Sequence, residues 1–169
     1  LALSGIEQPD EDLHAWNVEN IFRGLGTREE AKRRVFAWLY NPEAKDHLLE
    51  RTYDRKSVVK KYFTGEQVTT FFDRTIPCDN HRALNYIIQS TTSDMFLRQV
   101  LKVADFMREK MKKSFISFMM HDSVLLDVSR DELHSIQKMM QIFRETPLGK
   151  FKVNMKIGTN YGNLGEPTR

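Results

Sequence analysis

The sequence predicts an α+β fold, in which helices come first and strands with a single further helix follow. Two kinds of pattern carry this prediction. Apolar residues recur at helical spacing through much of residues 10–112. Two apolar runs around a polar tip, over 115–128, and an alternating segment at 151–157 are instead typical of strands.

The first helices are predicted from spacing and from capping residues. Residues 10–23 hold apolar side chains at near-helical spacing. Thr27 followed three residues later by Glu30 forms a capping-box pattern, which marks the start of a second helix. This helix should run to about Tyr40, because the residue before a proline, here in Asn41-Pro42, avoids the α region.

The middle of the chain is expected to remain mostly helical. Helices are predicted at 44–52 and 56–72, the second of them interrupted or ended near Gly65. Residues 73–80 are predicted to form a loop or a short hairpin, and a long helix should follow over about 82–112.

The last part of the chain changes to strand patterns. Phe115–Met120 and Val124–Val128 are predicted to pair as a hairpin. Ser129 is a candidate cap for a helix over 130–145. The alternation of apolar and polar residues at 151–157 predicts a final strand.

Composition limits the classes of protein to consider. The chain has 169 residues, 40% of them hydrophobic, and a net charge of +3, which permits nucleic-acid binding without arguing for it. Its one cysteine, Cys78, excludes an internal disulfide and a multi-cysteine zinc site, and favours a reducing compartment. No apolar run approaches a membrane span, so no membrane partner is expected. The chain begins at Leu1 rather than at Met, which predicts that it was cut from a longer reading frame.

Four residues on the predicted second helix form a stripe. Arg28, Lys32, Phe36 and Tyr40 recur every four residues, so they share one slanted face, with cations at its N-terminal end and aromatic rings beyond. A nucleoside triphosphate has the same polarity, since its phosphates attract cations and a helix N-terminus while its base packs on aromatic rings. The alternative is a surface helix with solvated cations and with Phe36 and Tyr40 in the core.

The tip of the predicted hairpin reads His121-Asp122-Ser123. Polar residues are usual in a turn, so an ordinary turn is one interpretation. The other is a metal site, because an Asp at the end of rigid strands can meet a second carboxylate from a neighbouring strand.

The spacing Arg-x3-Lys-x3-Phe-x3-Tyr is similar to the fingers-helix motif of family A DNA polymerases. The resemblance implies that Arg28 and Lys32 bind the phosphates of the incoming nucleotide, and that Lys32 is a candidate proton donor to the pyrophosphate leaving group. Phe36 would pack on the nucleotide, and Tyr40 would lie where the template base enters. Asn41-Pro42 departs from the family, which usually has Gly after the Tyr.

The hairpin tip resembles the third palm motif of the same family, His-Asp-Glu between two hydrophobic strands. In that family the Asp binds both catalytic Mg²⁺ ions and the His lies near the primer terminus, which are the roles implied for Asp122 and His121. Ser123 stands where the family usually has Glu, and a His-Asp-Ser tip also resembles single-subunit phage-type RNA polymerases.

Three further segments resemble the family in its order along the chain. Asn85 and Gln89, four residues apart on one helix face, match a helix whose Asn and Gln touch the primer–template, and His81 gives this segment a phage-like character. Asp12-Leu13-His14 resembles an Asp-x-His segment whose His contacts nucleotide phosphates. Lys156–Tyr161 contains the Gly-x-Asn-aromatic ending of the family.

The resemblance implies template-directed addition of a deoxynucleotide to a primer 3′ end, with Mg²⁺ as cofactor and with primer–template DNA and dNTP as partners. Residues 1–80 would hold the end of the first palm segment and the helical fingers, and residues 81–169 the palm with its catalytic hairpin 115–128 and a C-terminal strand. The family's other catalytic Asp would lie upstream of Leu1, so an upstream polymerase segment is an expected partner and the chain alone should be incomplete. The cytoplasm of a bacterium or phage-infected cell is the expected location. A phage-type RNA polymerase fragment and an inactive DNA-binding remnant stay open as alternatives.

Overall fold

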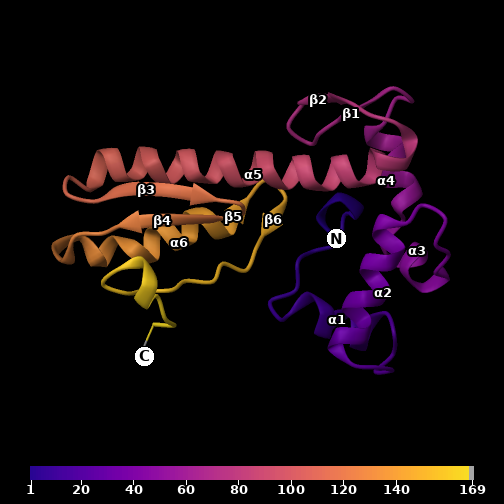
Figure 1. Cartoon of the computed structure of the whole chain (residues 1–169), viewed down its shortest axis with the longest axis horizontal. Coiled ribbons are helices and arrows are strands. Elements are labelled where there is room, and N and C mark those ends of the chain that lie inside the picture. The colour runs from indigo at the N-terminus through magenta and orange to yellow at the C-terminus, as the bar shows by residue number, and fades with distance from the viewer. Residues whose placement is uncertain (168–169) are drawn as a thin grey trace.

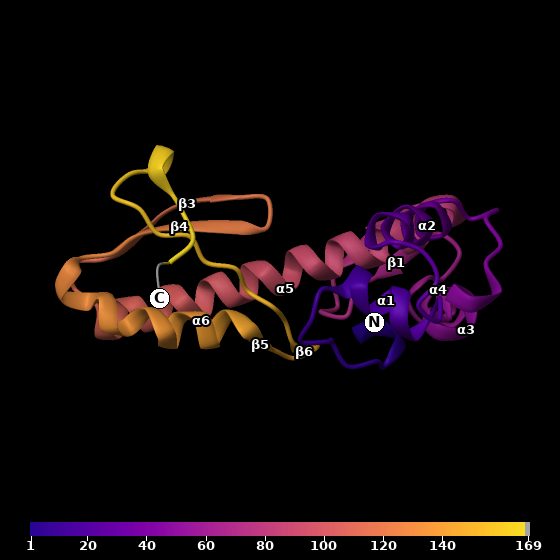
Figure 2. The same cartoon turned by 90° about the horizontal axis from the view of Figure 1, so that it is seen from below.

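The computed structural model describes residues 1–167 and shows an elongated molecule (Figure 1). Its helices are α1 (Leu13–Asn20), α2 (Arg28–Tyr40), α3 (His47–Tyr53), α4 (Arg55–Tyr62), α5 (Asn80–Lys110) and α6 (Ile136–Arg144). Its strands are β1 (Gln67–Thr69), β2 (Thr75–Pro77), β3 (Phe115–Met120), β4 (Ser123–Asp127), β5 (Glu145–Thr146) and β6 (Gly149–Lys150). Helices α1–α4 form one end, the β3–β4 hairpin and α6 form the other, and α5 runs between them (Figures 1 and 2). The α+β class predicted from the sequence is confirmed.

The helical end is organised by side-chain caps. The Asp12 carboxylate accepts the first N–H groups of α1, from His14 and Ala15. At the start of α2 the Thr27 N–H donates to Glu30 Oε2 over 2.7 Å, and the Glu30 N–H donates to Thr27 Oγ1 over 3.3 Å. The capping box is therefore formed as predicted, and α2 runs from Arg28 to Tyr40 as predicted.

Apolar side chains of α1, α2 and α3 close around a small core. Val35 and Trp38 of α2 and Leu49 of α3 are buried in it. Burial of these three side chains holds α2 by one face and leaves its opposite face free for other contacts.

The helix predicted over 56–72, which was expected to be interrupted or to end near Gly65, ends early, and residues 66–72 belong to a hairpin. Helix α4 ends at Tyr62, and β1 then pairs antiparallel with β2. The run Gln67-Val68-Thr69-Thr70 is rich in β-branched residues, and Val68 is fully buried against α4 and α5. Packing of this one side chain favours the strand over the helix that spacing alone predicted.

Helix α5 is 31 residues long and shares a core at each of its ends. Its first turns, through Ala83 and Ile87, pack with α4 and β1. Its last turns, through Val103 and Met107, pack with α6 and the β3–β4 hairpin. Among residues 1–167, no helix is both long and apolar enough to cross a membrane.

The hairpin expected at 115–128 is formed, with β3 and β4 paired antiparallel and a bulge at Ser117. The predicted helix 130–145 is only partly correct, since a 3-10 segment, η2 (Arg130–Ser135), precedes α6. Ser129 does not cap it with its side chain. The Ser129 N–H instead donates to Ser114 Oγ over 3.0 Å, which ties the end of the hairpin to its beginning.

The strand predicted at 151–157 is not formed. Side chains there alternate between half-buried and exposed up to Lys156, so the period seen in the sequence is real. In the described part of the chain, however, this segment has no strand beside it, and only Ile157 makes a β-bridge, to Gly165. Alternating burial alone does not make a strand, because a ladder needs a partner for its backbone groups.

Candidate nucleotide and metal sites

The stripe on α2 faces solvent. Phe36 is 39% exposed and Tyr40 is 49% exposed, while Val35 and Trp38 on the opposite face are buried. The ring centroids of Phe36 and Tyr40 lie 5.8 Å apart, and Lys32 Nζ lies 5.9 Å from the Phe36 centroid. The alternative that places both aromatic rings in the core is therefore wrong, and a cation and two rings are open to a ligand along one face.

His14 of α1 joins this face. Its imidazole meets the Phe36 ring edge-on, with centroids 5.6 Å apart. Burial, together with the positive charges of Arg28 and Lys32, lowers the pKa of His14, and the Asp12 carboxylate opposes the shift only in part. Its Nδ1 is buried and has no hydrogen-bond partner among residues 1–167. The spacing of the sequence does not predict that His14 and Phe36 meet, although the resemblance gives both a nucleotide-binding role.

Arg28, at the start of the stripe, is engaged by carboxylates. Its Nε donates to Asp12 Oδ1 and a terminal nitrogen donates to Asp12 Oδ2, each over 2.9 Å, and the other terminal nitrogen pairs with Glu29. The hydrogen bonds from Arg28 lower the pKa of Asp12 to about 2. The Asp12 carboxylate therefore offsets the charge that Arg28 places against the helix dipole.

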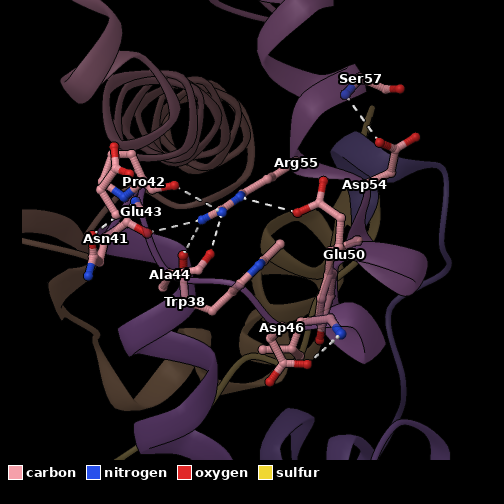
Figure 3. A network of polar contacts seen from close by, with 12 residues as sticks. Trp38, Asn41, Pro42, Glu43, Ala44, Asp46, Glu50, Asp54, Arg55 and Ser57 are labelled. Carbon is pink, nitrogen blue, oxygen red and sulfur yellow. Dashed lines mark hydrogen bonds and ion pairs between the residues drawn. The ribbon is translucent and has the colours of Figure 1, made fainter.

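The turn after Tyr40, where Asn41-Pro42 departs from the resemblance, is held by Arg55 of α4 (Figure 3). The Arg55 guanidinium donates to four backbone carbonyls, those of Trp38, Asn41, Pro42 and Ala44, over 2.6 to 3.1 Å. It also pairs with Glu50 at 3.2 Å and lies 4.7 Å from the centre of the Trp38 ring. Arg55 thus satisfies the carbonyls that a helix leaves free at its C-terminus and fixes where α2 ends. No spacing in the sequence points to this contact, because it joins residues up to 17 positions apart.

The hairpin tip holds His121, Asp122 and Ser123, all exposed. His121 has a φ of 54°, a left-handed conformation that suits the tight turn, and Ser123 Oγ donates to the Met120 carbonyl over 2.8 Å. The sheet here has two strands. Within residues 1–167, no cluster of three or more His, Cys, Asp or Glu side chains could hold a metal ion, so Asp122 is not part of such a cluster there.

The hairpin tip with Asp122 and the stripe on α2 belong to different elements of the structure. In both views the tip is the end of the hairpin nearer to helices α1–α4 (Figures 1 and 2). In the described residues no hydrogen bond or ion pair joins Asp122 to α2. The stripe on α2 and the candidate metal ligand are thus two separate parts of the surface.

Asn85 and Gln89 lie on one side of α5, near its N-terminal end. Gln89 is exposed, and Asn85 is half-buried with an Oδ1 that accepts no hydrogen bond from residues 1–167. Both amides keep hydrogen-bonding capacity that the described protein does not use.

The C-terminal segment returns over the hairpin (Figure 2). Tyr161 packs edge-on against Phe118 of β3, with ring centroids 5.6 Å apart. A Cβ atom on Gly158 would lie 2.4 Å from the Asn163 carbonyl oxygen, so only glycine fits there. The Gly-x-Asn-aromatic ending therefore has a steric role in this fold.

Comparison with known proteins places this fold among polymerase domains. The POL domain of Pol1 from M. smegmatis, solved in complex with DNA primer-template and dNTP, has a TM-score of 0.59 and 19% sequence identity, over 80% of this chain and 30% of that chain. A DNA polymerase of Bacillus phage SP01 is 31% identical over 99 residues, which is 52% of this chain and 11% of the phage protein. The chain spans a small part of both.

The family model for DNA polymerase family A matches residues 44–164. This is well over half of the chain, and the chain therefore belongs to DNA polymerase family A. The matched residues include α5 and the β3–β4 hairpin, whereas α1 and α2 lie ahead of them.

Proposed function

We propose that this chain supplies the dNTP-binding helix and one catalytic carboxylate of a DNA-directed DNA polymerase. The observation that supports it most is the cluster of half-buried Lys32 and His14 around the exposed Phe36 ring, in which a cation and aromatic rings from two helices meet. Arg28 and Lys32, with His14, would hold the triphosphate, and Phe36 would pack on the nucleotide. Tyr40 would lie at the entry of the template base.

DNA would run from the stripe toward the hairpin. Asn85 and Gln89 suit hydrogen bonding to a duplex minor groove, since amides offer both donors and acceptors and the described protein leaves theirs largely unused. His121, at the hairpin tip, would lie near the primer terminus. The cytoplasm of a bacterium or phage-infected cell follows from the phage relative as the proposed location.

Asp122 would be the magnesium ligand. It offers an exposed carboxylate on a paired hairpin, and carboxylate oxygens are the ligands that Mg²⁺ prefers. Bound magnesium would stabilise the attacking and leaving oxygens of the phosphoryl transfer. A two-metal site needs more than one carboxylate, and within residues 1–167 Asp122 belongs to no cluster of three or more metal-ligating side chains. We therefore propose that an upstream polymerase segment, joined or separate, supplies the other carboxylate, and that the 169-residue chain alone does not extend a primer.

Substitution of the cations tests the nucleotide stripe in an enzyme completed by an upstream palm segment. Lys32→Ala should lower kcat by about 10²–10³, because the ammonium faces a leaving group whose charge grows in the transition state. Arg28→Ala should raise the KM for dNTP. Arg33→Ala, an exposed cation on the same helix but off the stripe, is the matched control and should leave both parameters near wild type. Wild-type kinetics for Lys32→Ala and Arg28→Ala would contradict the proposal.

A single-subunit RNA polymerase is the second candidate, and Ser123 at the hairpin tip favours it. Phe36 and the paired amides Asn85 and Gln89 favour the DNA enzyme. The completed enzyme should incorporate dNTP in preference to rNTP on the same primer–template. A preference for rNTP would select the RNA polymerase instead.

A further inference from the structure

One carboxylate, that of Asp12, touches both helices of the proposed nucleotide site. Its Oδ1 accepts from the His14 and Ala15 N–H groups at 3.0 and 3.1 Å, which caps α1. The same carboxylate binds the Arg28 guanidinium through two hydrogen bonds of 2.9 Å each. The cap needs only a side-chain oxygen, whereas the bidentate pair needs the negative charge.

We infer that Asp12 is a positioning residue that holds Arg28 in a latched state, and that a polyphosphate must displace the Asp12 carboxylate to bind Arg28. This inference rests on the proposed function of the stripe. Two N–H donors of the Arg28 guanidinium face Asp12, and they are the same paired donors that a phosphate would use. The Asp12 carboxylate and a phosphate therefore compete for these two donors.

The Asp12–Arg28 ion pair is weak enough for a bound polyphosphate to break it. Side chains of Arg28 and Asp12 are 47% and 42% exposed, and exposed ion pairs are weak. A triphosphate carries several negative charges beside Lys32 and His14, whereas Asp12 carries one. The Asp12–Arg28 pair therefore yields to a triphosphate and re-forms when pyrophosphate leaves, which favours release of the product.

Two substitutions separate the charge of Asp12 from its cap. Asn and Ser both cap helices well, so Asp12→Asn and Asp12→Ser keep the start of α1 while removing the competing charge. Glu11→Gln removes one negative charge from the residue that precedes Asp12. It is the matched control, since Glu11 forms no ion pair with the residues that the structure describes.

The probe is inorganic tripolyphosphate, titrated into the 169-residue chain by calorimetry at low salt. Both Asp12 variants should bind it about two- to fivefold more tightly than wild type, which is the range that an exposed ion pair provides. Glu11→Gln should change the affinity by much less. The gain should vanish in the double variant Asp12→Asn with Arg28→Ala, because the latch acts through Arg28.

The outcomes distinguish the latch from the site. Unchanged or weaker binding by both Asp12 variants, with binding still lost in Arg28→Ala, overturns the latch and leaves the proposed site standing. Tripolyphosphate affinity that is insensitive to Arg28→Ala, or no binding by any of the proteins, overturns both. A merely structural Asp12 would give variants with lower melting temperatures and no gain in affinity.

Discussion

Replacement of Arg55 by Ala should destabilise the helical end of the molecule strongly. The Arg55 side chain is only 13% exposed, and it serves four carbonyl oxygens and one carboxylate. Water can replace it at the exposed carbonyls of Asn41 and Pro42, but not at Trp38, which is buried.

The magnitude follows from the contacts that water cannot restore. Hydrogen bonds to a charged group contribute about 1.5–3 kcal/mol each, and the two part-buried ones, to Trp38 and Ala44, dominate. Glu50 also loses its partner, so the free energy of unfolding should fall by about 3–5 kcal/mol. For a chain of this size the melting temperature would drop by roughly 6–20 °C.

Urea unfolding followed by circular dichroism and by tryptophan fluorescence measures the effect of Arg55→Ala. Arg55→Lys should recover little of the lost free energy of unfolding. A single ammonium group cannot reach all the carbonyls that surround the planar guanidinium of Arg55. Arg51→Ala, an exposed arginine on α3, is the control and should change the free energy of unfolding by less than about 0.5 kcal/mol. A loss below about 1 kcal/mol for Arg55→Ala would refute the assignment of Arg55 as the residue that fixes the end of α2.

Two further predictions concern other parts of the molecule. The pKa of His14 is lowered on folding, so the folded chain binds fewer protons than the unfolded one; stability should be full above about pH 6.5 and should decline as pH falls further. Melting temperatures between pH 8 and 5 should show this decline in wild type and less of it in His14→Gln, and equal declines would contradict it. Gly158→Ala should destabilise the C-terminal segment by about 1–3 kcal/mol because of the 2.4 Å clash with Asn163, seen as faster amide exchange at Ile157. Gly165→Ala, where a Cβ meets open space, should leave that exchange unchanged, and equal effects of the two substitutions would rule out the steric explanation.

Features set by neighbouring residues were predictable from the sequence. The capping box of Thr27 and Glu30 marks the start of α2, and the proline in Asn41-Pro42 predicts an end near Tyr40, so both bounds were predicted correctly. The hairpin around Asp122 was likewise predicted, because two apolar runs flank a short polar tip.

Features that depend on distant partners were missed. β1 forms because Val68 fills a core made by α4 and α5, and the expected strand at 151–157 lacks a neighbouring strand in the described chain. Arg55 reaches α2 across a turn, and Asp12 reaches Arg28 from another helix. Spacing along one element carries no information about such contacts.

The family assignment and the proposed nucleotide-binding role of α2 depend on different residues. Residues 44–164 match the family, and this stretch includes the hairpin with Asp122. The nucleotide role of α2, ahead of that stretch, rests on its own geometry, with His14 and Lys32 against an exposed Phe36. The two halves of the proposed site therefore need separate tests.

The metal role of Asp122 is tested most directly by Asp122→Asn, with primer extension and thermal stability measured on the same completed enzyme. Asn keeps the shape of the turn but removes the charge that would hold magnesium. We predict extension near background, with a melting temperature unchanged or slightly raised, because a carboxylate near another carboxylate carries repulsion when metal is absent. Ser123→Glu, which restores the residue usual in the family, should keep activity. Extension at the wild-type rate by Asp122→Asn would contradict the metal role and leave Asp122 as an ordinary turn residue.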